Sequence, residues 1–293
     1  MIMKRMYRLP VLLITLVGVS LSISPRALAK PTHKTDLPRL QTDPAEPELV
    51  SFPSGDLVLR GYLYKPEGAG PFPAIIWNHG SEKLPGQQPE LARFYTKQGF
   101  VFFLPHRHGQ GRSPGEYIQD LIQKYEAIEK DRILFGKYVV RLHEEYNKDV
   151  VAAVEWLRGQ PFIDQQRLVM SGCSYGGIQT LLTAEKGLGL RAFIPFAPAS
   201  KSWSNTALRK RLLEAVLNAK APLFLIQAQN DFSLGPSEVL GPMIKRKGPP
   251  NQARIYPPYG TTPQEGHFDF ATKEVGIDIW GPDVLAFFQV VIR

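Results

Sequence analysis

The chain has 293 residues, of which 43% are hydrophobic and 21% are charged, and its formal net charge is +8. This composition excludes an intrinsically disordered chain, and the length suits a domain with one sizeable core. The basic residues are scattered, without the interleaved aromatic residues of single-stranded nucleic-acid binders, and the single cysteine, Cys173, excludes an intramolecular disulfide.

The N-terminal residues have the pattern of a secretory signal peptide. A basic stretch, 4–8, precedes the apolar run 11–23, and Ala-Leu-Ala at 27–29 is typical of a cleavage site. We therefore predict a signal peptide at 1–29 and an exported protein, periplasmic or secreted. The alternative is an uncleaved membrane anchor, but the apolar run is shorter than the ~20 residues that span a bilayer.

A flexible segment and then a β-hairpin are predicted where the folded region begins. Residues 30–49 are rich in proline and show no apolar period, which is typical of a flexible N-terminal segment. In 57–64 the apolar residues alternate, which predicts the edge strand of a hairpin whose turn is 54–56. The folded domain is therefore predicted to span 50–293.

Strands and helices alternate through the rest of the chain. The short apolar runs 73–77 and 100–104 are typical of buried parallel strands, and 89–98 between them has a helical pattern. The pattern then predicts helix 147–158, strand 167–170, helix 177–184, strand 192–196, helix 207–218, strand 222–228, strand 253–256 and helix 282–291. Such alternation predicts an α/β fold, with a mostly parallel sheet of about eight strands and helices on both faces.

The segment 116–146 departs from this simple alternation. Its apolar residues recur at helical spacing, ahead of the helix predicted at 147–158. One interpretation is a small helical lid that excludes water from a catalytic site. The other is plain packing against the edge of the sheet, and the periodicity does not distinguish the two.

The strongest chemical signal is a G-x-S-x-G motif at 172–176, between a predicted strand and a predicted helix. This setting is typical of the nucleophile elbow, in which a sharp turn exposes a serine, here Ser174. The glycines two residues before and after it allow a close approach that a β-carbon would prevent. Cys173 could also act as a nucleophile, but glycines do not flank it in this way. We therefore interpret it as a small buried side chain. The alternative is a glycine-rich turn with an incidental serine.

A serine nucleophile needs a base and an acid, and in this arrangement the acid follows the nucleophile and the histidine comes last. His267 is the one histidine after Ser174, and it lies in a polar loop between the last predicted strand and helix. Asp231 just follows a strand, where it could accept the Nδ1–H of His267 or, alternatively, form a helix N-cap or an Asx turn. Asp269 and Asp278 follow the histidine and so break the order.

Two backbone N–H groups are predicted to form an oxyanion hole. Tyr175 N–H lies at the start of a helix whose dipole favours negative charge near the serine. The second donor is expected in the loop after the strand 73–77, where we select Ser81 N–H, with Gly80 allowing the chain to turn. His79 in the same loop is interpreted as a structural histidine, since a base already follows the nucleophile.

These motifs resemble those of α/β-hydrolases in the dienelactone hydrolase and prolyl oligopeptidase-like groups, over residues 50–293. The resemblance rests on the His79-Gly80 turn, the run 109–115 (GQGRSPG), the elbow 172–177, Asp231 and Gly266-His267. It implies the α/β-hydrolase fold and a Ser-His-Asp serine hydrolase, and neither a metal nor an organic cofactor. Those groups usually have Asp and an Arg-Gly pair ahead of the run, where this chain has His106, Arg107 and His108, so the hydrogen bonding there is expected to differ.

The predicted function is hydrolysis of a carboxylic ester or related acyl bond through an acyl-enzyme. An exported peptidase for short peptides is the alternative, because the Ser-Tyr-Gly-Gly form of the elbow resembles the peptidase branch. A third alternative is a non-catalytic binding protein with the same fold. We expect a small-molecule ester or short-peptide substrate, no nucleic-acid partner, and no stable membrane insertion after signal cleavage.

Overall fold

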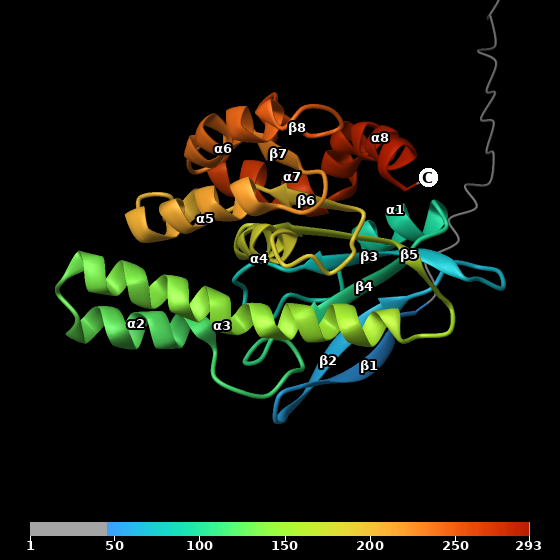
Figure 1. Cartoon of the computed structure of the whole chain (residues 1–293), viewed down its shortest axis with the longest axis horizontal. Coiled ribbons are helices and arrows are strands. Elements are labelled where there is room, and N and C mark those ends of the chain that lie inside the picture. Colours follow the sequence, from blue (N-terminus) through green and yellow to red (C-terminus); the bar gives the residue numbers. More distant parts are fainter. Residues whose placement is uncertain (1–45, 293) are drawn as a thin grey trace, which may run out of the picture. The chain divides into compact units, whose positions relative to one another are not determined.

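The computed structural model describes residues 46–292, so the predicted signal peptide and most of the segment 30–49 lie outside the described residues. Its strands and helices follow in this order (Figure 1): β1 (Glu48–Ser54), β2 (Leu57–Tyr64), β3 (Phe72–Asn78), α1 (Pro89–Lys97), β4 (Val101–His106), α2 (Ile118–Ile128), α3 (Arg132–Arg158), β5 (Ile163–Cys173), α4 (Tyr175–Ala184), β6 (Ala192–Phe196), α5 (Thr206–Asn218), β7 (Phe224–Ala228), α6 (Gly235–Arg246), β8 (Gln252–Tyr256), α7 (Phe270–Thr272) and α8 (Glu274–Val291). No helix within 46–292 is long and apolar enough to cross a membrane.

One sheet of eight strands forms the centre of the domain, in the order β1-β2-β4-β3-β5-β6-β7-β8. β2 pairs antiparallel with both β1 and β4, and the strands from β4 to β8 are parallel. The predicted mostly parallel α/β fold is therefore confirmed. The prediction that 57–64 is an edge strand is wrong, because the hairpin partner β1 covers its outer side and buries Val50 and Phe52.

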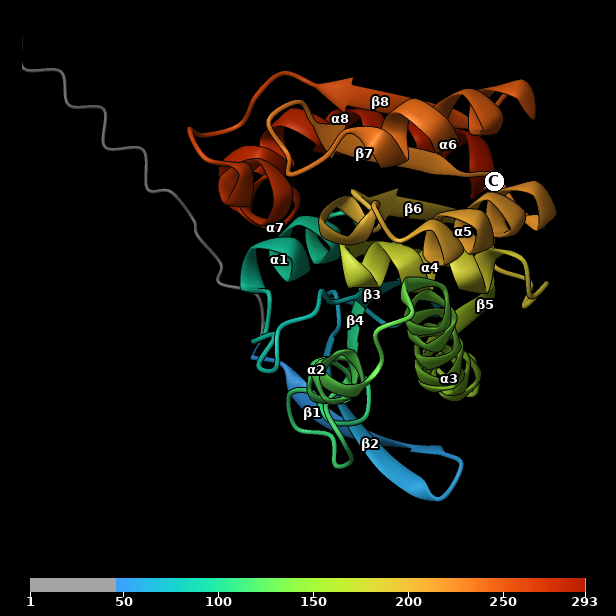
Figure 2. The same ribbon diagram turned by 90° about the vertical axis from the view of Figure 1, so that its left-hand side faces the viewer.

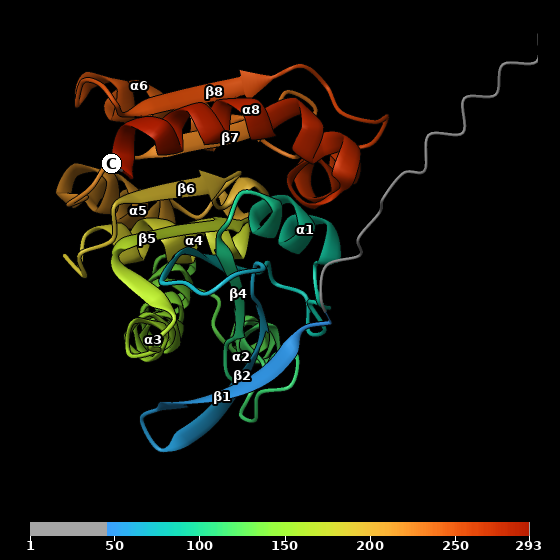
Figure 3. The same ribbon diagram turned by 90° about the vertical axis from the view of Figure 1, so that its right-hand side faces the viewer.

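Helices cover both faces of the sheet and divide its core in two. α3, α4, α5 and α6 pack on one face, and α1 and α8 pack on the other, as Figures 2 and 3 show from opposite sides. Strands covered on both faces, such as β4 (VFFLPH), are buried along their whole length. Burial on both faces explains why such strands are continuous apolar runs in the sequence.

Two helices begin earlier than the sequence pattern predicts. α3 is one continuous helix of 27 residues, so the predicted start of a separate helix at Asn147 is wrong. The start of α3 is set by Asp131, whose carboxylate accepts hydrogen bonds from the first free N–H groups of the helix. α8 begins at Glu274 and not at Pro282, because buried Ile277 and Trp280 pack in the core and offset the ~3 kcal/mol that an internal proline costs.

The pattern missed α6, which contains Pro236, Gly241 and Pro242 and so has the composition of a turn. Its buried residues Leu240 and Ile244 pack against the sheet. A β-carbon at Gly241 would lie 3.2 Å from the β-carbon of Ala253, so the glycine permits close packing on β8. Tertiary packing therefore outweighs the local propensity here.

Candidate active site

Ser174 lies in the turn between β5 and α4, at the carboxyl end of β5. Its backbone has φ 60° and ψ −116°, a conformation that residues with a side chain rarely adopt. Main-chain hydrogen bonds hold this turn: Ser174 N–H donates to Phe196 O (3.0 Å), and Ser174 O accepts from Ile178 N–H (3.1 Å). The motif at 172–176 thus has the strained strand–turn–helix geometry expected of a nucleophile elbow.

Two glycines let this elbow approach the end of β3. A β-carbon at Gly176 would lie 1.8 Å from the carbonyl oxygen of Asn78, and one at Gly172 would lie 2.6 Å from the same atom. Both distances are far shorter than any real contact, so neither position accepts a side chain without movement of the backbone. The close approach brings the loop after β3, which carries Ser81, next to the elbow.

Asp231 and His267 come together from the segments that follow β7 and β8. His267 Nδ1 lies 2.9 Å from Asp231 Oδ1, an ion-pair distance without the alignment of a hydrogen bond. Both residues are buried, and the thiol of Cys173 donates a weak hydrogen bond to His267 O (3.3 Å). His267 therefore lies against the residue that precedes Ser174, although no hydrogen bond joins Ser174 to His267 among the described residues.

The carboxylate of Asp231 accepts three hydrogen bonds. Ser200 Oγ and Phe232 N–H each donate to Oδ1 (both 2.6 Å), and Gln227 Nε2 donates to Oδ2 (3.0 Å). The orientation of the Gln227 amide is set by the carbonyl oxygen of Ser233, which accepts from Nε2 (2.7 Å), and the Ser237 hydroxyl donates to Oε1 (2.6 Å). Hydrogen-bond donors thus hold both oxygens of Asp231 in a buried position.

His267 lies in a π-helical turn, Glu265–Asp269, and not in the loop that the sequence predicts. The turn forms because the carboxylate of Glu265 accepts hydrogen bonds from the N–H groups of Thr261 and Thr262, each 2.8 Å long. These bonds and the threonine hydroxyls lower the pKa of Glu265 to about 2. The Glu265 carboxylate therefore organises the chain just before His267.

Asn230, the neighbour of Asp231, links the two segments of the acid and the histidine. Its Nδ2 donates to Tyr259 O (2.8 Å), and its Oδ1 accepts from Tyr259 N–H (2.8 Å). A β-carbon at Gly266 would lie 2.4 Å from Asn230 Oδ1, so the glycine before His267 permits this contact. The sequence pattern missed both Asn230 and Ser200, because neither has a periodic signal.

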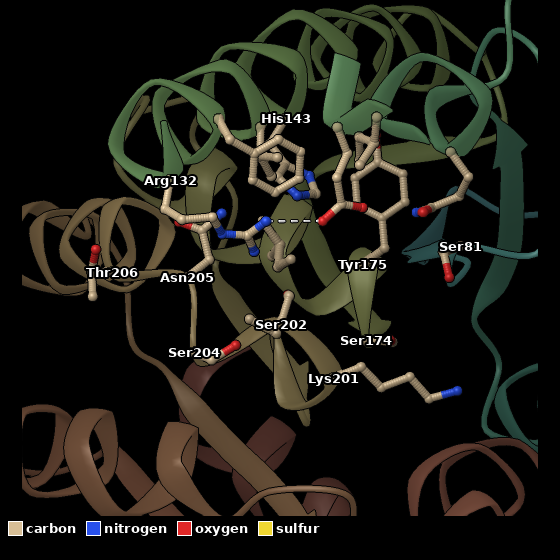
Figure 4. Close-up of a pocket in the computed structure, with 17 residues that line it drawn as sticks. Ser81, Arg132, His143, Ser174, Tyr175, Lys201, Ser202, Ser204, Asn205 and Thr206 are labelled. Carbon is tan, nitrogen blue, oxygen red and sulfur yellow. Dashed lines mark hydrogen bonds and ion pairs between the residues drawn. The ribbon is translucent and has the colours of Figure 1, made fainter. Parts of the chain in front are cut away.

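One cavity of about 520 Å³ is lined by Ser174 together with Ser81 and Tyr175 (Figure 4). α2 contributes Gln119, Ile122 and Glu126 to its wall, and α3 contributes Arg132, Phe135, Val139 and His143. The rest of the lining is Ile178, Ala199, Lys201, Ser202, Ser204, Asn205 and Thr206. The segment 116–146 thus forms part of the wall over Ser174, while its behaviour as a lid stays a prediction.

The cavity wall carries both an ion pair and a neutral histidine. Glu126 Oε1 accepts from Arg132 Nη1 (3.0 Å), across the connection between α2 and α3 (Figure 4). His143 is buried, and desolvation together with the nearby charge of Arg107 lowers its pKa to about 3. The imidazole of His143 is therefore uncharged at neutral pH, and its Nδ1 has no hydrogen-bond partner among residues 46–292.

The two predicted oxyanion donors have free N–H groups. The first hydrogen bond of α4 runs from Ile178 N–H, so Tyr175 N–H has no partner within its helix. For Ser81 N–H, too, the described part of the chain supplies no backbone or side-chain acceptor. Both residues line the cavity, where a substrate oxygen could accept these N–H groups.

The histidines near β3 and β4 are held in structural contacts. His79 is buried with Nδ1 3.0 Å from Gly80 O, and desolvation lowers its pKa well below the usual value, so that it stays neutral. His108 Nδ1 lies 2.6 Å from Asp149 Oδ2, and His108 N–H donates to the same oxygen (2.8 Å). The His108 ring also stacks on Tyr146, with ring centres 3.6 Å apart.

Residues 55–236 match the family of X-Pro dipeptidyl-peptidases (S15 family), which is more than half of the chain. The chain belongs to this family. Within residues 46–292, no group of three or more His, Cys, Asp or Glu is arranged to hold a metal ion. The match to a peptidase family confirms the predicted resemblance to serine hydrolases.

Curated relatives of this family member include a transferase and an esterase. The polyketide transferase grgF of a Penicillium species is 26% identical over 68% of this chain and 64% of its own length. The acetyl esterase Axe7A of Xylanibacter ruminicola is 26% identical over 43% of this chain and 29% of its own length. The chain therefore spans less than two thirds of the length of either relative.

Solved structures share the fold at low sequence identity. The acylaminoacyl peptidase of Pyrococcus horikoshii superposes with a TM-score of 0.62 at 20% identity, over 85% of this chain and 42% of that chain. A dienelactone hydrolase-like structure from Klebsiella pneumoniae superposes with a TM-score of 0.59 at 17% identity, over 83% of this chain and 98% of that chain. At these identities the similarity establishes the α/β-hydrolase fold alone.

Proposed function

We propose that the chain hydrolyses a carboxylic ester or a related acyl bond through an acyl-enzyme on Ser174. The observation that carries this proposal is the strained backbone of Ser174, a residue that lines the cavity. The buried Asp231–His267 pair lies against Cys173, the residue before Ser174. Strain of this kind is retained where the surrounding structure imposes it, and it is concentrated at functional sites.

In the proposed reaction Ser174 Oγ attacks the acyl carbon and His267 accepts the serine proton. Nε2 of His267 is available for this transfer, since among the described residues it has no hydrogen-bond partner. Asp231 accepts the Nδ1–H of the imidazolium, and the N–H groups of Tyr175 and Ser81 stabilise the oxyanion. His267 then returns the proton to the leaving group, and water releases the acyl group by the same route.

A peptidase acting on short peptides is the second candidate, and two observations favour it. The family match is to peptidases that cleave after X-Pro, and the cavity wall carries a carboxylate, Glu126. A carboxylate near the nucleophile could bind the free amino terminus of a peptide. Glu126 already pairs with Arg132, which weakens its hold on a second cation. We therefore place the ester first.

Turnover of two chromogenic substrates distinguishes these candidates. The wild-type protein is assayed with p-nitrophenyl butyrate and with Gly-Pro p-nitroanilide, beside the variants Ser174→Ala and His267→Ala. We expect kcat/KM to be higher for the butyrate, and both variants to lose at least about 10³-fold in kcat. Higher kcat/KM for the anilide would favour the peptidase, and full activity in Ser174→Ala would overturn the proposed mechanism.

We also propose that the protein is exported, to the periplasm or the medium, after removal of residues 1–29. The proposal is supported by the basic, apolar and Ala-Leu-Ala pattern of the sequence alone. N-terminal sequencing of the protein recovered from the periplasm and the medium tests it. A chain beginning at Lys30 is expected, whereas a full-length chain in the membrane fraction would show an uncleaved anchor.

A further inference from the structure

Arg107 is a buried charge beside the proposed oxyanion donors. It directly follows β4, and its side chain is 1% exposed. Moving a charged group out of water is costly unless hydrogen bonds and nearby charges compensate it. No carboxylate within residues 46–292 forms an ion pair with Arg107. The carboxylates of Glu82 and Asp149 favour the charge of Arg107 from beyond ion-pair distance, so neutral groups make its direct contacts.

Those neutral groups belong largely to the loop after β3. Arg107 Nη2 donates to His79 O (2.8 Å) and to Gly80 O (2.7 Å), and it lies 2.9 Å from His79 Nδ1. Arg107 Nε donates to Gln110 Oε1 (3.2 Å), and Gln110 Nε2 donates in turn to Glu82 O (2.7 Å). The segment after β4 thus binds the carbonyl oxygens of three residues around Ser81, namely His79, Gly80 and Glu82.

The same guanidinium lies over the ring of Tyr175. Its central carbon is 4.1 Å from the ring centre, a distance typical of a cation–π contact. Such contacts are strongest where water is excluded, and Tyr175 is 3% exposed. One side chain therefore contacts both segments that carry the predicted oxyanion donors, the loop of Ser81 and the first residue of α4.

The carbonyl contacts also determine where the N–H groups point. The Gly80–Ser81 peptide bond is not among the cis bonds of the described chain, so Ser81 N–H is antiparallel to Gly80 C=O. Because Gly80 O is bound by Arg107, Ser81 N–H is directed away from Arg107 and has no acceptor in the described part of the protein. The guanidinium thus fixes the orientation of the peptide that supplies Ser81 N–H.

We propose that Arg107 is a positioning residue that orients the Ser81 and Tyr175 amides toward the oxyanion of the substrate. The inference rests on the proposed function, and it adds a role to a residue that has no place in the triad. Arg107 touches no reacting atom and acts through the two donors. Loss of the guanidinium should leave substrate binding intact and weaken stabilisation of the tetrahedral intermediate, since an oxyanion forms only there.

Steady-state kinetics and two inhibitors of Arg107→Met test the proposal, with p-nitrophenyl butyrate as substrate. Removing one oxyanion donor costs about 10²–10³ in kcat, and we expect a loss of about 10² with KM within about threefold of wild type. The Ki of an alkyl trifluoromethyl ketone, which forms a charged tetrahedral adduct, should rise by a similar factor. The Ki of butyrate, which stays trigonal, should change less than about threefold.

Arg211→Met is the control, because Arg211 is a partly buried arginine whose hydrogen bonds go to Glu144 and Glu185 and not to the segments of Ser81 and Tyr175. Its kcat and both Ki values should equal those of wild type. If Arg107→Met does not fold, Arg107→Lys replaces it, and the ratio of the ketone Ki to the butyrate Ki is compared.

Each outcome bears on one claim. The positioning role would be overturned if either Arg107 variant kept both its kcat and its ratio of ketone Ki to butyrate Ki within threefold of wild type. A change in KM alone would also overturn it. Undiminished hydrolysis by Ser174→Ala would instead overturn the proposed function. The failures of the two proposals are therefore distinguishable.

Discussion

Replacement of Asp231 by asparagine tests how the acid acts, because the surroundings of its two oxygens differ from those that an amide needs. Oδ1 accepts from Ser200 and from a main-chain N–H, and Oδ2 accepts from Gln227. An amide NH₂ in either place faces a donor. Rotation of the Gln227 amide would not relieve this, because Gln227 Nε2 also donates to the carbonyl oxygen of Ser233 (2.7 Å). Asn at 231 therefore leaves one buried donor unsatisfied in either orientation.

We expect Asp231→Asn to lower the free energy of unfolding by about 2 kcal/mol, the usual cost of an unsatisfied buried donor together with a lost charge-assisted bond. Its kcat for p-nitrophenyl butyrate should fall by about 10⁴, because the amide no longer holds the imidazole in the tautomer that accepts the serine proton. Thermal unfolding and steady-state kinetics measure the two effects. Asp278→Asn, an exposed carboxylate on α8, is the control. A variant that keeps more than a tenth of the wild-type kcat would refute the assignment of Asp231.

Three further predictions concern the elbow and the histidine turn. Gly176→Ala should lose about 10² in kcat and at least about 1 kcal/mol of stability, since its β-carbon would meet Asn78 O. A β-carbon at Gly159 would have no contact below 3.5 Å, so Gly159→Ala should match wild type in kinetics and in thermal unfolding. Glu265→Gln should lower the melting temperature at pH 7. Because the pKa of Glu265 is lowered to about 2, the difference in melting temperature from wild type should shrink as the pH falls from about 4.5 toward 2. A constant difference down to pH 2 would contradict the role given to the Glu265 carboxylate. Cys173 is buried and its thiol pKa is raised well above the usual value by desolvation, so iodoacetamide should modify it only after unfolding; rapid alkylation of the native protein would show otherwise.

The order of the motifs predicts the three central residues because it follows from topology. In a parallel sheet the carboxyl ends of neighbouring strands meet at one edge, so residues after β5, β7 and β8 approach each other whatever the loops between them. Ser174, Asp231 and His267 could be selected on this ground, and their segments do converge. The backbone geometry of Ser174 also follows from its flanking glycines.

The supporting residues could not be predicted in this way, because their roles depend on tertiary contacts with no local pattern. Ser200 reaches Asp231 from 31 positions away, and Arg107 reaches His79 across 28. Helix bounds failed for a related reason: the start of α8 is decided by burial of Trp280 and Ile277, and Pro282 alone indicates the wrong residue. The π-helical turn at His267 likewise depends on the hydrogen bonds of Glu265.

Covalent labelling of the nucleophile tests the central claim most directly. The purified protein is incubated with a fluorophosphonate and its intact mass is measured, beside Ser174→Ala treated in the same way. Our account predicts a single phosphonyl adduct on the wild-type protein and none on the variant, because only a serine activated by a base reacts rapidly. The same adduct on both proteins, or on neither, would contradict the assignment of Ser174 as the nucleophile.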